Sequence, residues 1–277
     1  MSPYVLAAGM MVVSGSVHAV VNAIVKGGRD RMAARAATDG TSALLLLPGI
    51  ALVAVPSGAW QWLAISGVVH IVYLYAMIRA YAVADFSAAY PVLRGTAPLV
   101  TAIVTIGVLG ERASIAQMVG IGVIGAAMLL LSIGRHLAPG ALGWAMLTGT
   151  MTAAYTVADA HGVRAAPSVA SYIVWDFVTI GGMSVALFAA LSRGAIFAAM
   201  RAQWRPCAAA GALSILTYGL ALAALSLGPT APLAALRETG MVTALVIAVA
   251  ALGERVTWQR SAAALGILTG AAVIIVA

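Results

Sequence analysis

Long hydrophobic runs alternate with short polar connections along the whole chain. A helix that crosses the hydrocarbon core of a bilayer needs roughly 20 mostly apolar residues. Ten runs of about this kind predict ten membrane-spanning helices, and the connections leave no room for a soluble catalytic domain, so the function is expected inside the bundle. The runs cover residues 3–25, 41–56, 60–83, 88–109, 114–133, 141–163, 168–191, 206–227, 231–252 and 257–276.

The composition agrees with this pattern and predicts an all-α membrane protein. Of the 277 residues 63% are hydrophobic and only 8% are charged, against roughly 25% charged in soluble domains. The first run follows no basic segment and is longer than the core of a signal peptide, so we expect it to stay in the mature protein. A single cysteine, Cys207, excludes an internal disulfide and a cysteine-rich metal site.

The basic residues concentrate in every second connection. Eleven fall in or beside the odd-numbered connections and two in the even-numbered ones. The positive-inside rule then places the odd connections in the cytoplasm and both termini outside. Their spread over short connections is typical of topology signals, so no nucleic-acid partner is expected. The eleven are Lys26, Arg29, Arg31, Arg35, Arg79, Arg135, Arg193, Arg201, Arg205, Arg255 and Arg260, and the two are Arg112 and Arg164.

The chain contains an internal repeat. One shift of 143 residues superposes Tyr75 on Tyr218, "LRGT" (93–96) on "LRET" (236–239) and "LGER" (109–112) on "LGER" (252–255). The halves, residues 1–136 and 137–277, would each hold five spans, and an odd number of crossings inverts the second half relative to the first. Two inverted five-helix repeats with substrate near the bilayer midplane are the plan of many secondary transporters.

With these features the sequence resembles the EamA type of the drug/metabolite transporter superfamily. The likeness covers nearly the whole chain and rests on the ten spans, the two "LGER" ends and a last helix in each half that is rich in small residues. It implies that four helices of each half surround a central cavity and that substrates are amino acids or other small metabolites. Two features depart from the common pattern: "SGSVHAVVN" (14–22) stands where many members carry a Trp-Gly pair, and the loop charges place the termini outside.

Small residues four apart occur in the last helix of each half. Ala116 and Gly120 lie in the fifth run, and Gly266 and Gly270 lie in the tenth. Such pairs let helix backbones approach closely, either in a homodimer or within one subunit. The sequence lacks the G-x-S-x-G and H-E-x-x-H motifs of hydrolases, so we expect no enzyme, no catalytic residue, no metal and no cofactor.

Charged residues inside the spans are the strongest site candidates, because each costs several kcal/mol in hydrocarbon unless it faces a partner or water. Arg94 and Arg237 lie about 9 Å inside the starts of their spans, at about 1.5 Å per residue, on opposite sides of the membrane. By this depth Glu238, Asp159 and Asp176 fall on the side of Arg237, whereas Asn22, Arg79 and Asp85 fall on the side of Arg94.

This grouping suggests that Arg237 pairs with Asp159 or Asp176 and leaves Glu238 to accept a proton or a substrate ammonium group. The alternative is an ion cluster that only holds the helices together. The Glu238→Gln variant would then distinguish them: in the functional case it abolishes flux and leaves folding intact.

Other polar and aromatic side chains are candidates for substrate binding, with packing as the alternative for each. A histidine in a span either contacts substrate and titrates near neutral pH or hydrogen-bonds a neighbouring helix. Tyrosine and tryptophan either line the cavity or pack against other helices. These candidates are His18, Asn22, His70, Tyr73, Tyr75, Trp175 and Tyr218, and Met77 shares a helix face with His70 and Tyr73.

The sequence therefore predicts a secondary transporter of the cytoplasmic membrane, which is the inner membrane where a cell has two. Amino acid export by alternating access is expected, with the acids engaging the amino group and an arginine the carboxylate. Proton coupling is compatible with the same residues. Efflux of cationic drugs, which an acidic excess favours, and a membrane structural protein without flux are the alternatives.

Overall fold

The computed structural model describes residues 2–84, 86–133, 137–252 and 257–277, and in these segments it is all-helical. Asp85, Arg135 and the "GER" of the second "LGER" motif, which ends in Arg255, lie outside the described residues. The first half contains α1 (Pro3–Lys26), α2 (Arg31–Leu46), α3 (Trp60–Val83), α4 (Phe86–Ala102) and α5 (Ile115–Leu130). The second contains α6 (Pro139–Ala165), α7 (Val169–Leu191), α8 (Ile196–Ala202), α9 (Trp204–Leu227), α10 (Thr230–Leu236), α11 (Gly240–Leu252) and α12 (Trp258–Val276).

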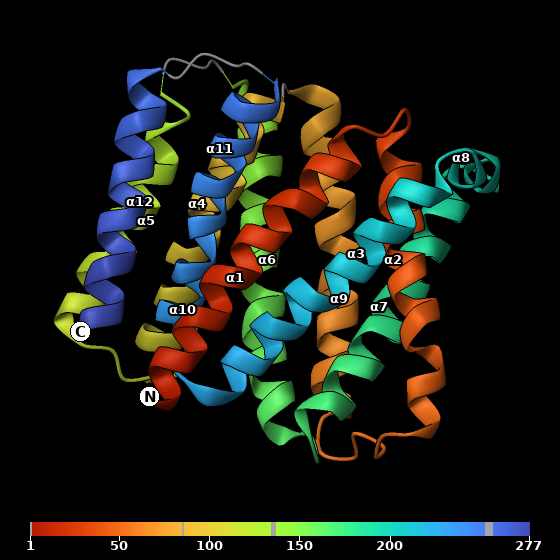
Figure 1. The fold of residues 1–277 in the computed structure, drawn as a ribbon, viewed down its shortest axis with the longest axis horizontal. Coiled ribbons are helices and arrows are strands. Elements are labelled where there is room, and N and C mark those ends of the chain that lie inside the picture. The colour runs from red at the N-terminus through yellow and green to blue at the C-terminus, as the bar shows by residue number, and fades with distance from the viewer. Residues whose placement is uncertain (1, 85, 134–136, 253–256) are drawn as a thin grey trace.

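The protein is a multi-pass membrane protein. Seven helical segments in the described part of the chain are long and apolar enough to cross a membrane, and α5 is a shorter apolar helix. They stand side by side in one bundle, with both termini at the same end (Figure 1). We call this the termini end, and the opposite end, where α1 finishes and α2 begins, the α1–α2 end.

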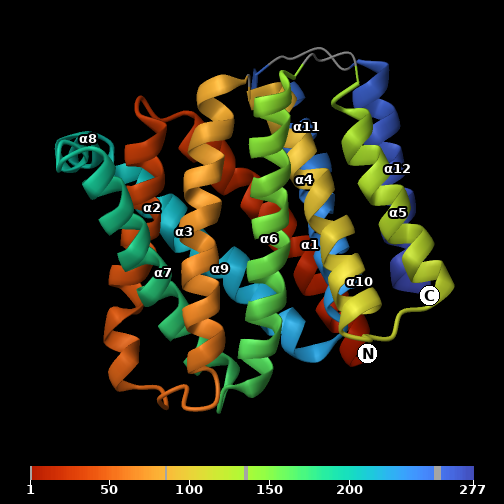
Figure 2. The same ribbon diagram turned by 180° about the vertical axis from the view of Figure 1, so that it is seen from behind.

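Helix pairing crosses between the two halves of the chain. The view from behind shows α3 beside α6, and α5 beside α12 at one edge (Figure 2). In the same way α1 packs on α9 and α11, α2 packs on α7 and α9, and α4 packs on α6. The centre of the bundle is therefore surrounded by helices of both halves.

Capping side chains fix where several helices begin. Asp30 accepts a hydrogen bond from the backbone N–H of Ala33 at the start of α2. Ser114 and Gln117 form a reciprocal capping box before α5. Each satisfies backbone N–H groups that have no partner within the helix. The cap at Asp30 starts α2 ten residues before the predicted run 41–56, so that prediction was wrong about where the helix begins.

The span predicted at 231–252 is broken in its first half. A single 3₁₀ turn, η3 (Arg237–Thr239), separates α10 from α11. The hydroxyl of Thr239 donates to the carbonyl of Leu236 at 2.7 Å, across this turn. Broken helices in membranes are tolerated where they are buried in protein or line a cavity. The break thus presents Arg237 and Glu238 at the centre of the bundle.

Close backbone contact holds this break against α1. A Cβ at Gly15 would collide with the carbonyl oxygen of Arg237, and a Cβ at Gly240 would collide with the backbone of Gly15. Only glycine fits at either position.

The small residues of α5 and α12 pack inside the subunit. A Cβ at Gly120 would lie 2.8 Å from the carbonyl oxygen of Gly270, and one at Gly270 would lie 2.7 Å from that of Gly120. Of the two possibilities that the sequence left open, contact within one subunit is the one these two glycines make.

Candidate functional site

A cavity of about 450 Å³ occupies the centre of the bundle. This volume suits a small metabolite, since ligand sites commonly enclose about 300–1,000 Å³. Helices α1, α2, α3, α4, α6, α7 and α9 contribute to its wall, together with η3. Eight of the candidate residues line it: His18, Asn22, His70, Tyr73, Arg94, Asp176, Tyr218 and Arg237.

The other four candidates lie elsewhere. The ring of Tyr75 is exposed and meets the edge of Trp144, with ring centroids 6.0 Å apart. Trp175 packs edge-on against Trp60 with centroids 5.1 Å apart. Asp159 is fully buried behind the wall, and Glu238 borders a small second cavity beside the first. Tyr75 is thus not the pseudosymmetric cavity partner of Tyr218 that the repeat suggested.

Asp159 acts as an anchor for two tyrosines. It accepts a hydrogen bond from the hydroxyl of Tyr172 at 2.9 Å and another from that of Tyr218. Gly162, one helical turn further along α6, leaves the space that the Tyr172 ring fills. Asp159 therefore orients Tyr218 from behind the cavity wall.

The pairing of charges differs from the predicted one. Glu238 forms an ion pair with Arg94, with Nε and Oε2 2.9 Å apart. The guanidinium of Arg237 lies over the ring of Tyr218, 5.1 Å from its centroid. Among the described residues no ion pair joins Arg237 to Asp159 or Asp176. The predicted partners of Arg237 and the unpaired state of Glu238 were both wrong, because Arg94 and Glu238 meet at the centre.

Two residues of the cavity wall that take part in no described ion pair each have a buried polar atom without a hydrogen-bond partner. These atoms are Nε of Arg237 and Oδ1 of Asp176. Asp176 is only 2% exposed. A buried polar group without a partner is costly, so such groups in a cavity point to a ligand or water that completes them. The wall thus offers one donor and one acceptor of opposite charge.

A second ion pair lies in the wall contributed by α2. Arg35 donates through Nε to Oδ2 of Asp39 at 2.8 Å, and the hydroxyl of Ser184 donates to the same oxygen at 2.7 Å. The sequence interpretation counted Arg35 as a loop charge and did not consider Asp39. Their i, i+4 spacing after the cap at Asp30 was the available signal.

Aromatic rings cover much of the remaining wall. His70 stacks on Tyr155 with centroids 4.0 Å apart, and Tyr73 meets the edge of Tyr155 at 5.6 Å. Phe177 meets the edge of Tyr218 at 6.1 Å. Tyr155 and Phe177 were not among the candidates, since an interior aromatic residue gives no sequence signal that separates lining from packing. The amide of Asn22 donates to the hydroxyl of Tyr90 at 3.3 Å.

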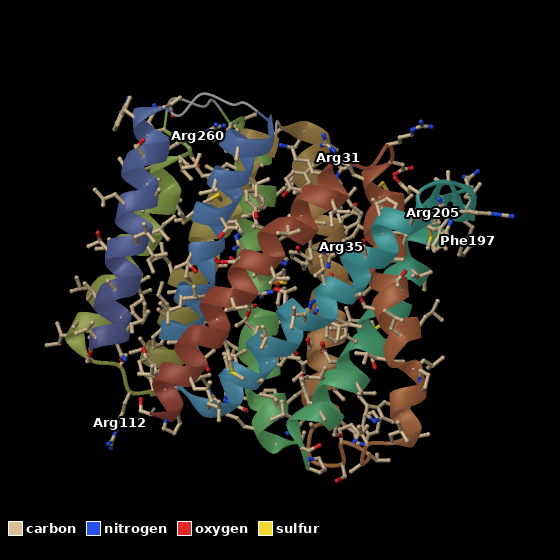
Figure 3. All side chains as sticks on the ribbon, in the orientation of Figure 1. Arg31, Arg35, Arg112, Phe197, Arg205 and Arg260 are labelled. Atoms are coloured by element: carbon tan, nitrogen blue, oxygen red, sulfur yellow. The ribbon has the colours of Figure 1, made fainter. Side chains whose placement is uncertain are left out.

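The cavity extends to the α1–α2 end of the bundle. Its wall includes Lys26, the last residue of α1, and Arg31, the first of α2. The side-chain view places Arg31 near this end and Arg35 closer to the centre (Figure 3). A solute can therefore approach from this end past basic side chains.

A polar cluster ties four segments together at the termini end. Glu111 accepts hydrogen bonds from the backbone N–H and the hydroxyl of Thr230, both at 2.8 Å, and from Arg164 at 3.1 Å. Arg164 also donates to the carbonyls of Leu225 and Gly228. Partial burial raises the pKa of Glu111, but the hydrogen bonds from Thr230 and Arg164 outweigh it and hold the pKa below its usual value. The cluster closes this end around a charged carboxylate.

Within the described part of the chain, no group of three or more His, Cys, Asp or Glu side chains is placed to hold a metal ion.

A solved structure shares the fold described above. A solved crystal structure, described only as that of a protein, superposes with a TM-score of 0.75 over 98% of this chain and 95% of its own, at 19% identity. No curated protein matches the sequence. The model of the EamA-like transporter family matches residues 140–276. This match to the second half of the chain agrees with the drug/metabolite transporter resemblance seen in the sequence.

Proposed function

We propose that this protein is a secondary transporter that exports amino acids across the cytoplasmic membrane by alternating access. The observation that carries the proposal is the presence of Arg237 and Asp176 in one cavity wall, each with a buried polar atom that has no hydrogen-bond partner. A guanidinium suits a carboxylate, and a carboxylate suits an ammonium group. An amino acid carries both.

The proposed architecture is ten membrane crossings in two inverted repeats, residues 1–136 and 137–277. The pairing of helices supports it. If α1 corresponds to α6 and α3 to α9, then the contact of α1 with α9 is the counterpart of the contact of α6 with α3, and both occur. The contact of α4 with α6 likewise has its counterpart in that of α11 with α1. Related halves would give the bundle two similar arrangements, which alternating access requires.

The direction of transport follows from the proposed orientation. Arg31, Arg205 and Arg260 lie toward the α1–α2 end, and Arg112 lies at the termini end (Figure 3). By the positive-inside rule the α1–α2 end would face the cytoplasm and both termini would lie outside. The cavity extends to that end, so a cytoplasmic solute would load from it.

Glu238 is the residue for which we propose coupling to protons. Its ion pair with Arg94 joins α4 to the break between α10 and α11, and it is only 4% exposed. Protonation of Glu238 would remove the attraction to Arg94 and weaken the contact between the halves. A facilitator without coupling would keep the pair intact throughout.

The argument for cationic drug efflux was an expected excess of acidic residues around the site, and this argument is now weaker. The predicted excess of acids around the site included Asp159 and Glu238, but Asp159 lies behind the wall and Glu238 is paired with Arg94. Asp176 is the member of the three that lines the central cavity.

The test is uptake of labelled amino acids by proteoliposomes that contain the purified protein, with and without an imposed pH gradient. We expect saturable uptake that empty liposomes lack, and a response to the gradient that the Glu238→Gln variant does not show. Uptake that does not respond to the pH gradient would contradict proton coupling but would still support amino acid transport. Absence of uptake for every amino acid would contradict the proposal and favour a protein without this flux.

A further inference from the structure

The cavity wall carries more positive than negative charge. Its cationic side chains are Lys26, Arg31, Arg35, Arg94 and Arg237, and its carboxylates are Asp39 and Asp176. Glu238 in the adjoining small cavity adds a third carboxylate beside Arg94. Five cations against three carboxylates leave an excess of two positive charges in the described wall.

Internal ion pairs account for only part of this charge. Arg35 is matched by Asp39, and Arg94 is matched by Glu238. Arg237 contacts the face of Tyr218, and its Nε is buried without a hydrogen-bond partner. Arg35, Arg94 and Arg237 line the same cavity as His18, and they come from three different segments, α2, α4 and η3. Positively charged side chains therefore line the cavity from its centre to the α1–α2 end, which we call the mouth.

Charge held in a cavity with low-dielectric walls attracts and concentrates solutes of the opposite sign. A neutral zwitterion would add one charge of each sign and leave the excess of two unchanged. A solute with a second carboxylate would reduce it. Guanidinium groups suit carboxylates especially well, because their planar donors match both oxygens.

We propose that the transported solute is a dicarboxylic amino acid, a refinement that rests on the proposed function. Arg237 would bind the α-carboxylate, and Asp176 would bind the ammonium group. The second carboxylate would face the basic side chains toward the mouth. Arg31 and Arg35 occupy successive turns of one face of α2, about 6 Å apart along its axis, and Figure 3 shows Arg35 deeper than Arg31.

The decisive comparison is between glutamate and glutamine, which have nearly the same shape and differ by one charge. Proteoliposomes are loaded with unlabelled glutamate or glutamine, and counterflow uptake of the same labelled amino acid is measured. The initial rate at low concentration should be roughly tenfold or more higher for glutamate, as expected for a hydrogen-bonded charge. Arg31→Gln should lower glutamate uptake by about two- to fivefold, the scale of an exposed ion pair, and should lower the ratio of glutamate to glutamine uptake.

Arg112→Gln is the matched control, because it removes an exposed arginine at the other end of the bundle (Figure 3). It should not change the ratio of glutamate to glutamine uptake. If Arg31→Gln and Arg112→Gln lowered this ratio equally, the cause would be general surface charge. That result would overturn the role of Arg31 in binding the second carboxylate.

The outcomes separate this inference from the proposed function. Uptake of glutamine at a rate equal to or above that of glutamate would overturn the inference and leave amino acid transport in place. If neither moves but succinate does, the amino acid assignment is wrong and a dicarboxylate remains the substrate. If none of the three moves, both proposals fail.

Discussion

Arg94 in α4 and Glu238 in η3 form a buried ion pair, with 2.9 Å between Nε and Oε2 and side chains only 11% and 5% exposed. The pair joins the two halves of the chain at the point where the span formed by α10 and α11 is broken. Removal of one partner from a buried pair leaves an uncompensated charge, which typically costs about 3–5 kcal/mol.

The first prediction is that Glu238→Gln and Arg94→Gln each lower the apparent unfolding temperature of the detergent-purified protein. The double variant should recover most of the loss, because it removes both charges together. This prediction differs from the sequence hypothesis, in which Glu238→Gln leaves folding intact. Additive losses in the double variant would show that the pair contributes no coupling, and a double-variant cycle of thermal unfolding measures this directly.

The second prediction concerns the close contact between α1 and the helix break. Gly15→Ala should destabilise the protein by about 1–3 kcal/mol, the usual range for overpacking, because the new methyl group would collide with the carbonyl of Arg237. Gly9→Ala in the same helix is the matched control, since a Cβ at Gly9 has no heavy atom within 4 Å. Thermal unfolding of both variants is the measurement. Equal effects would mean that helix propensity, rather than the contact, decides the outcome.

The third prediction is a pH dependence at the termini end. The pKa of Glu111 is held below its ordinary value by hydrogen bonds from Thr230 and Arg164 that outweigh the effect of burial. A lowered folded pKa stabilises the protein above the unfolded pKa, about 4.3, and the stabilisation is lost as pH falls through the folded value. The wild type should lose more stability than Glu111→Gln when the pH is lowered from about 6 to below 4. Parallel curves would rule out this role of Glu111.

The fourth prediction separates the anchor from the cavity. Tyr172→Phe removes the hydroxyl that donates to Asp159 but leaves the bond from Tyr218 in place. We expect a loss of about 1 kcal/mol in stability, typical of one hydrogen bond, and a substrate concentration at half-maximal uptake that stays the same. A strong shift in this concentration would show that Tyr172 acts on the site through Tyr218, and uptake kinetics in proteoliposomes would detect it.

The hydrophobic pattern was sufficient to predict the longest helices. The run 60–83 coincides with α3, and 168–191 differs from α7 by one residue, since a long apolar stretch has few alternatives in a membrane. The start of α2 was missed because "RMAARAATDG" is too polar and alanine-rich to count as a span. Its alanines are nevertheless buried against α7 and α9. The short helix α8 was missed for lack of length.

Eight of the twelve candidates line the cavity, because polar residues in spans are disfavoured unless they face the interior. The sequence did not allow us to predict which of the charged candidates form ion pairs with one another. Depth along a helix placed Arg94 and Arg237 on opposite sides, yet Arg94 reaches Glu238, since the two spans cross near the centre and long side chains bridge the remaining distance. Arg35 was assigned to a loop because the start of its helix was missed.

The central claim is that the cavity binds and moves an amino acid through Arg237 and Asp176. The most direct test is counterflow uptake of labelled glutamate by proteoliposomes with the wild type, Arg237→Gln, Asp176→Asn and, as a control, Arg112→Gln. The account predicts saturable uptake by the wild type and the control, and a loss of roughly tenfold or more in each cavity variant, the scale of one charged hydrogen bond. Unchanged uptake in both cavity variants would contradict it.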